Sequence, residues 1–130
     1  MEVRKLKSQG FTLVEAMVAL VILVILLLGL LQSLIVYYDV STRNLLRNEA
    51  IRIAYEYADK FRNMPLSSIP ASDTYTENRQ VRNSQVTYSI KTTSVSKTGG
   101  KIKEITIEVS WSYRGKQFYH IIKTLVGEDE

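Results

Sequence analysis

The hydrophobic pattern of the chain begins with a long apolar stretch near the N-terminus. Residues 16–31 carry no polar side chain, and residues 11–31 are interrupted by a single acid, Glu15. A helix needs about 20 mainly apolar residues to cross the hydrocarbon core of a bilayer. The pattern therefore predicts a membrane-spanning helix that holds one carboxylate near its N-terminal end.

Beyond residue 36 charged residues return, and the apolar positions form a stripe at helical spacing. Its members recur every three or four residues: Leu46, Ala50, Ile53, Ala54, Tyr57 and Phe61. Such spacing is typical of an amphipathic helix. Pro65 disfavours helical geometry at Met64, so we expect one helix over residues 12–63. Residues 11–36 would be its membrane-spanning half and residues 37–63 its amphipathic outer half.

The C-terminal part of the chain alternates with a period of two residues. The clearest run alternates Ile105, Ile107, Val109, Trp111 and Tyr113 with polar residues, and a similar run surrounds Tyr88. Turns are expected at residues 96–101 and at Arg114-Gly115. In the last strand, residues 117–126, both faces are apolar, so the sequence does not show which face is buried. Residues 86–130 therefore predict an antiparallel meander.

Residues 64–85 show no sustained periodicity and contain both prolines. We interpret them as a connecting loop that wraps the surface or carries function. An apolar sheet face has to be covered, and the stripe on the helix is the available cover. The expected fold class is α+β, a long N-terminal helix packed against a small three- to four-stranded antiparallel sheet.

Composition and charge narrow the function classes. The 130 residues allow one small domain beside a membrane segment. The absence of cysteine excludes disulfides and thiolate chemistry. The net charge is +4, of which residues 1–10 contribute +2, so nucleic acid is only weakly supported as a partner. No nucleophile–base or paired-carboxylate arrangement is visible, and we expect neither an enzyme, a cofactor nor a metal site.

The flanking charges predict an orientation in the membrane. Arg4, Lys5 and Lys7 precede the apolar stretch, and the first charge after it is Asp39. Positive residues stay cytoplasmic, so the N-terminus is expected in the cytoplasm and the C-terminal domain outside the inner membrane. No small-residue cleavage site of the secretory kind follows the apolar core. The small residue lies before it, at Gly10, which is either a flexible joint or a cleavage site.

The residues at this junction resemble a known signal. Gly10-Phe11-Thr12-Leu13-Val14-Glu15 after a short basic leader is similar to the type IV prepilin signal, shared by pilins and by type II secretion pseudopilins. Residues 15–23 and 107–111 look more like minor pilins of the PilV type than major pilins. Gln32 stands where major pilins usually have a proline, and the disulfide-bounded loop of many pilins is absent. Both departures favour a low-abundance subunit.

The resemblance implies a function. A prepilin peptidase would remove the leader, residues 1–10, by cutting after Gly10, and would N-methylate Phe11. Other pilin-like subunits and an inner-membrane assembly platform would then draw the subunit into a type IV pilus, or fimbrium. In the family, the position of Glu15 pairs with the N-terminal amine of a neighbouring subunit. The alternatives are a secretion pseudopilin and, from another class, an uncleaved single-pass membrane protein with a periplasmic binding module.

Glu15 also has a purely local explanation. Thr12 and Glu15 form a T-x-x-E capping box before an apolar run, and an acid in the first turn suits the helix dipole. Capping and intersubunit pairing are compatible, since the first acts in the membrane and the second in the filament.

For each of the remaining conspicuous side chains, a purely structural role is possible beside a functional one. Trp111 is expected in the core and His120 as an ordinary sheet residue. Arg43 and Arg47 are either solvated or face lipid phosphates or acids on a neighbouring subunit. A last option is a DNA-binding patch, formed by Arg79, Arg82 and Lys91.

Overall fold

The computed structural model describes Gly10 and residues 12–127; residues 1–9, 11 and 128–130 lie outside the described part. The chain divides into two compact units, residues 1–40 and residues 41–130. Helix α1 (Leu13–Arg62) contributes to both units. The expected helix over residues 12–63 agrees with these bounds within one residue at each end.

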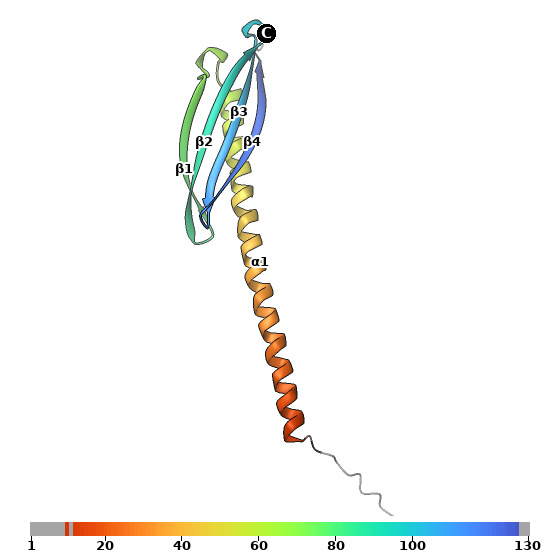
Figure 1. Ribbon diagram of the computed structural model, residues 1–130. Coiled ribbons are helices and arrows are strands. Elements are labelled where there is room, and N and C mark those ends of the chain that lie inside the picture. Colours follow the sequence, from red (N-terminus) through yellow and green to blue (C-terminus); the bar gives the residue numbers. More distant parts are fainter. Residues whose placement is uncertain (1–9, 11, 128–130) are drawn as a thin grey trace, which may run out of the picture. The chain divides into compact units, whose positions relative to one another are not determined.

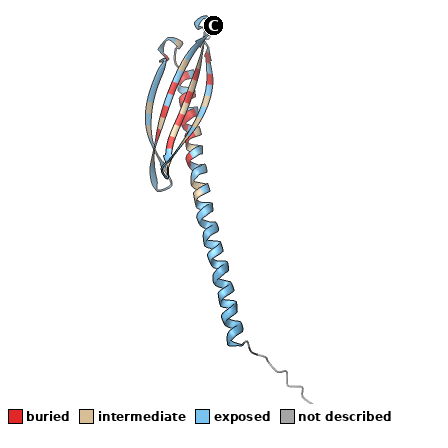
Figure 2. Ribbon diagram, viewed as in Figure 1, coloured by how far each residue is buried: buried red, intermediate tan, exposed pale blue. Residues whose placement is uncertain are grey.

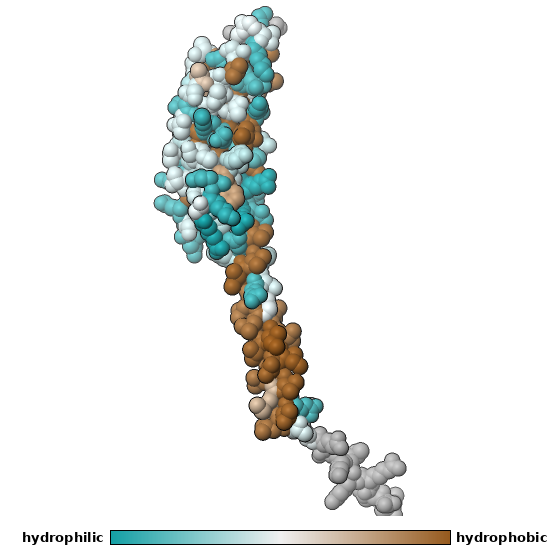
Figure 3. Space-filling model, in the orientation of Figure 1, coloured by the Kyte–Doolittle hydropathy of each residue, from teal (hydrophilic) through white to brown (hydrophobic). Residues whose placement is uncertain are grey.

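The first unit contains the apolar part of α1. Large hydrophobic side chains between Leu13 and Val40 are 45% to 79% exposed, and Figure 3 shows hydrophobic residues covering this part of the helix. By length and composition, α1 can cross a membrane. This part of the helix therefore needs a hydrocarbon environment or other apolar helices around it.

The second unit contains a sheet of four strands: β1 (Ser72–Val81), β2 (Ser84–Lys97), β3 (Ile102–Tyr113) and β4 (Lys116–Gly127). Each strand is antiparallel to the next one along the chain, so the sheet order is β1-β2-β3-β4 (Figure 1). The short helix η2 (Thr98–Gly100) joins β2 to β3. The predicted α+β fold class is confirmed.

The core of the second unit lies between α1 and one face of the sheet (Figure 2). Every member of the predicted helical stripe is buried: Leu46, Ala50, Ile53, Ala54, Tyr57 and Phe61. Trp111 is 5% exposed and its ring stacks on that of Phe118, with centroids 6.0 Å apart, which confirms its place in the core. The buried Tyr88 hydroxyl donates to the Leu46 carbonyl at 3.0 Å.

The structure shows which of the two apolar sets of side chains on β4 faces the core. The side chain of Val126 is buried and those of Phe118 and Ile122 are partly buried against the core. Tyr119, Ile121 and Leu125 are instead exposed on the other face of β4. Because both sets are apolar, only the position of the strand in the sheet distinguishes them.

The expected loop over residues 64–85 is wrong for most of its length. It contains the short helix η1 (Leu66–Ser68) and the ten-residue strand β1. The four partly buried positions of β1 are Tyr75, Glu77, Arg79 and Val81. Two of these four positions carry charges, so the strand lacks the apolar alternation from which a half-buried strand is predicted.

The turn predicted at Arg114-Gly115 joins β3 to β4. Both residues have positive φ, 50° and 75°. Two consecutive positive φ values are characteristic of the two-residue turns that match the twist of antiparallel strands. Glycine at the second position accepts this geometry without steric strain.

Candidate functional site

The junction before α1 holds the residues on which the functional prediction rests. Gly10 is exposed, and a Cβ added to it would meet no atom within 4 Å. Thr12 immediately precedes the first helical residue. The Glu15 amide donates to Thr12 Oγ1 at 3.2 Å, and the Ala16 amide donates to the Thr12 carbonyl at 3.1 Å. The Thr12 hydroxyl thus satisfies one of the amides that have no partner within the helix, and the Thr12 carbonyl accepts the first intrahelical bond.

Glu15 lies in the first turn of α1 and is exposed. Its carboxylate is favoured there by the partial positive charge of the helix N-terminus. Within the described residues Glu15 forms no ion pair. Phe11, the expected methylation site and second residue of the cleavage junction, lies outside the described residues, as do residues 1–9 of the expected leader.

One polar group in the apolar part of α1, the hydroxyl of Ser33, has a local partner. The Ser33 hydroxyl donates to the Gly29 carbonyl at 3.1 Å, one turn earlier in the helix. This bond lowers the cost of placing a hydroxyl among apolar surroundings. Gly29 has open space around its Cα, so its small size is not required by a contact within the first unit.

A cluster of charged side chains joins β1 to α1 in the second unit through ion pairs and hydrogen bonds. Arg79 donates to Glu56 Oε2 and to Glu77 Oε2, each at 2.6 Å, and to Glu49 Oε1 at 3.5 Å. The Tyr57 hydroxyl donates to Glu77 Oε1 at 3.0 Å. Burial raises the pKa of Glu77, but the hydrogen bonds from Arg79 and Tyr57 lower it further, so the net direction is down. Burial and the bond to Glu77 raise the pKa of Tyr57 to about 12.

The structure does not bring the proposed DNA-binding residues together. Arg79 is occupied by carboxylates, whereas Arg82 donates to the Ser41 hydroxyl at 2.8 Å. Lys91 is exposed on β2 between the buried Ile90 and Thr92, and so lies on the face of the sheet away from the core. A shared phosphate-binding surface is therefore not formed by these three side chains.

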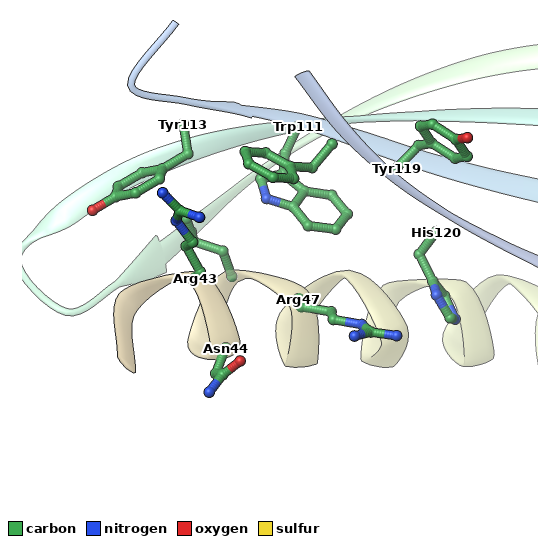
Figure 4. Close-up of a pocket in the computed structure, with 9 residues that line it drawn as sticks. Arg43, Asn44, Arg47, Trp111, Tyr113, Tyr119 and His120 are labelled. Atoms are coloured by element: carbon green, nitrogen blue, oxygen red, sulfur yellow. The ribbon is translucent and has the colours of Figure 1, made fainter. Parts of the chain in front are cut away.

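The arginine pair and the histidine, for which the sequence gave separate explanations, lie at one place. Arg43 and Arg47 of α1 and His120 of β4 line a pocket of about 290 Å³ within the second unit (Figure 4). Sequence spacing gave no signal for this pocket, because the helix and β4 are distant in the chain. Among the described residues no group of three or more side chains is arranged to hold a metal ion.

Comparison with known families gives one match. Residues 5–31 match the family model described as the prokaryotic N-terminal methylation motif. The match spans Lys5, Lys7, the Gly10-Phe11 junction and the apolar stretch to residue 31, and it supports the general family of type IV pilin-like proteins. No curated protein and no solved structure matches the chain significantly.

Proposed function

We propose that this chain is a minor pilin-like structural subunit. The methylation motif at residues 5–31 carries the proposal, because it marks substrates of prepilin peptidase that assemble with other pilin subunits. Peptidase cuts after Gly10 and methylates the new amino group of Phe11. Support also comes from α1, whose exposed apolar part fits a membrane-anchored protein and offers a surface on which similar helices can pack.

In this proposal each part of the chain has one task. Residues 1–10 are the leader, and residues 11–36 anchor the subunit in the inner membrane before they enter the filament core. Residues 37–63 carry the sheet. The N-terminus stays on the cytoplasmic side and the C-terminal domain lies outside. The inner-membrane assembly platform then moves the subunit into a type IV pilus.

Glu15 makes assembly depend on cleavage. A lone carboxylate among packed apolar helices costs about 2.5–3.5 kcal/mol even on the lower insertion scale. The free amine created at Phe11 is a cation that can offset this cost in a neighbouring subunit. Before cleavage, Thr12 and the helix dipole keep the first turn of α1 stable without that partner.

Mass spectrometry of the N-terminus in the membrane fraction tests the proposal. The expected product begins with N-methylated Phe11, and a Gly10→Leu variant should remain uncut and outside filaments. Open space surrounds Gly10, so the substitution leaves the fold undisturbed. Gly29→Ala is the matched control, since this glycine also has open space around it. Recovery of Gly10→Leu in filaments at the normal level would contradict the proposal.

A second variant separates cleavage from assembly. Glu15→Ala should insert, be cut and be methylated like the wild type, because the peptidase junction is intact. Its amount in sheared filaments should fall at least tenfold. Normal incorporation would reduce Glu15 to a residue of the helix cap.

The N-terminal residue and the co-isolated proteins distinguish the alternatives. An uncleaved single-pass protein would retain Met1 as its first residue. A type II secretion pseudopilin would be cut and methylated in the same way, but would be isolated with secretion components rather than pilus components.

A further inference from the structure

The face of the sheet that points away from α1 is left uncovered by the described residues. Helix α1 packs on the opposite face, where the core lies (Figure 1). Successive side chains of a strand point to opposite faces of a sheet. Ser89, which follows the buried Tyr88, and Ser110, which precedes the buried Trp111, therefore lie on the outer face. This outer face is open to a partner of the domain.

Strand pairing aligns uncharged polar side chains of the outer face in two neighbouring rows. The first row takes one hydroxyl side chain from each strand, in the order Thr76, Ser89, Ser110 and Tyr119. The second row lies two residues nearer to the β1–β2 and β3–β4 turns. Its members are Asn78, Thr87, Ser112 and Gln117. Together the two rows form the polar patch.

The polar patch lacks the charges that the rest of the outer face carries. The next row on the same face contains Lys91 opposite Glu108, and Glu104 and Lys123 lie further along β3 and β4. Solubility alone is served by charged residues of both signs, which the two rows do not use. A ligand with phosphates or carboxylates would need basic side chains opposite them. The polar patch therefore matches an uncharged ligand.

The polar patch presents hydrogen-bond donors and acceptors on a rigid frame. Each hydroxyl can donate one hydrogen bond and accept two. The Thr87 hydroxyl donates to Asn78 Oδ1 at 2.7 Å, which orients this amide and leaves its NH₂ group as a donor. Strands hold such groups more precisely than loops do. Each row crosses four strands and is about 14 Å long, and the rows are about 7 Å apart. The patch thus suits an elongated molecule that is rich in hydroxyl groups.

An exposed aromatic ring lies at the β4 end of the first row. Tyr119 is 69% exposed, and Figure 4 shows its side chain pointing away from α1. Tyrosine provides a large, rigid and amphipathic contact area at a low entropic cost. The C–H groups of a sugar ring can pack against such an aromatic face, while the phenolic hydroxyl bonds to a sugar hydroxyl. A row of hydroxyls that ends on an aromatic ring is suited to a saccharide.

We propose that the polar patch is a binding site for a neutral polysaccharide. The polysaccharide chain lies across the four strands, accepts and donates hydrogen bonds along the first row, and stacks one sugar ring on Tyr119. The amides and hydroxyls of the second row bind the same chain from one side. This inference goes beyond the proposed function and does not depend on it, because it requires only the folded sheet.

Titration of the full-length chain with chitohexaose and with cellohexaose tests the site. A polyoxyethylene detergent keeps the protein in solution without adding a sugar headgroup, and saturation-transfer NMR detects the bound saccharide. Tyr119→Ala should lower the affinity about tenfold. Tyr55→Ala is the matched control and should leave it unchanged, because Tyr55 is a 58% exposed tyrosine on α1. Absence of binding to both hexasaccharides would overturn the proposal.

A second pair of variants tests the hydroxyl row itself. Thr76→Val removes one hydroxyl and keeps the branched shape of the side chain, so the affinity should fall about fivefold, as for one lost hydrogen bond. Thr93→Val is the control, because Thr93 is exposed on the same face of the sheet but outside the two rows. Far-ultraviolet circular dichroism verifies that each variant is folded. Equal affinities of the two threonine variants would refute the role of the row.

The remaining outcomes identify the partner of the polar patch. Binding of the sulfated polysaccharide heparin but of neither hexasaccharide would show that charge governs binding and would overturn the proposal. So would a Tyr119→Ala variant that binds both hexasaccharides normally but loses self-association in analytical ultracentrifugation, since the face would then bind a second copy. A preference for chitohexaose would identify an N-acetylated glycan as the ligand, and a preference for cellohexaose a plain glucan; either result supports the proposal.

Discussion

Glu77 illustrates how single side chains connect the sheet to the helix. It accepts hydrogen bonds from Tyr57 on α1 and from Arg79 on its own strand. Its side chain is 29% exposed, so solvent weakens the electrostatic attraction without removing it. Only the ionised carboxylate can accept from both donors in this way. The stability of the β1 contact should consequently depend on pH.

We expect the free energy of unfolding to fall in acid, and Glu77 to contribute to the fall. The pKa of Glu77 is lower in the folded state than in the unfolded state. Glu77 therefore makes its full contribution to the free energy of unfolding above the unfolded pKa, about 4.3. This contribution is lost as the pH falls through the lower folded value. The difference in stability between wild type and Glu77→Gln should therefore be largest at pH 7 and shrink towards pH 3.

Urea unfolding of the full chain in neutral detergent, followed by the fluorescence of the single tryptophan, measures this difference. Trp111 is buried in the core and reports on its opening. Glu108→Gln is the control, because Glu108 makes no ion pair within the part of the chain that the structure describes. A Glu77→Gln difference that is equal at all pH values would contradict the assignment.

At the scale of elements, the regular periods of the sequence predicted most of the fold. The stripe from Leu46 to Phe61 identified the helix face that covers the sheet, and the alternation in β3 identified its buried residues. Strand β1 could not be predicted, because its inner face uses Glu77 and Arg79 where a period-two pattern requires apolar side chains. Arg79 is compatible with the inner face because carboxylates on α1 lie opposite it, and Glu77 is compatible because Arg79 and Tyr57 donate hydrogen bonds to it.

The candidate site also has a part that the sequence predicts and a part that it does not. Gly10, Thr12 and Glu15 are close in the sequence, so their motif can be recognised without a structure. The pocket lined by Arg47 and His120 requires the fold, since a helix and an edge strand have to meet before the two side chains do. Residues that lie close together in the sequence can therefore be recognised as a motif, whereas residues that only folding brings together cannot.

Strand β1 should be the element that depends most on its charges. Arg79→Met removes the guanidinium and leaves Glu49, Glu56 and Glu77 close together, so we expect a loss of about 2 kcal/mol in the free energy of unfolding. Hydrogen exchange should rise first in the amides of β1. Lys91→Met on the neighbouring strand is the control and should change neither quantity. Unchanged exchange in β1 would show that the charge cluster does not hold the strand.

At the scale of the whole molecule, the two units are suited to different surroundings. Every buried residue described for the chain lies between Leu46 and Val126. The large apolar side chains between residues 13 and 40 are all exposed and contribute nothing to that core. The stability of the second unit should accordingly be independent of the first.

A fragment of residues 41–130 should fold alone and remain soluble without detergent. Its thermal unfolding, followed by circular dichroism, should be a single cooperative transition. Ile53→Ala, which removes a fully buried side chain, should lower its stability by about 2–5 kcal/mol. A fragment with no cooperative transition would show that residues 1–40 are required for the core.

The strand order of the sheet has a consequence for how the domain is delivered across a membrane. Each strand pairs with the strand that follows it in the chain, so a segment leaving the translocation channel already has its neighbour beside it. Hairpins form in about 1–10 μs, and short-range pairings of this kind speed folding. The chain has no cysteine and needs no oxidant to finish. In the proposed orientation, the domain can therefore fold in step with its export, strand by strand, in the order in which it is released.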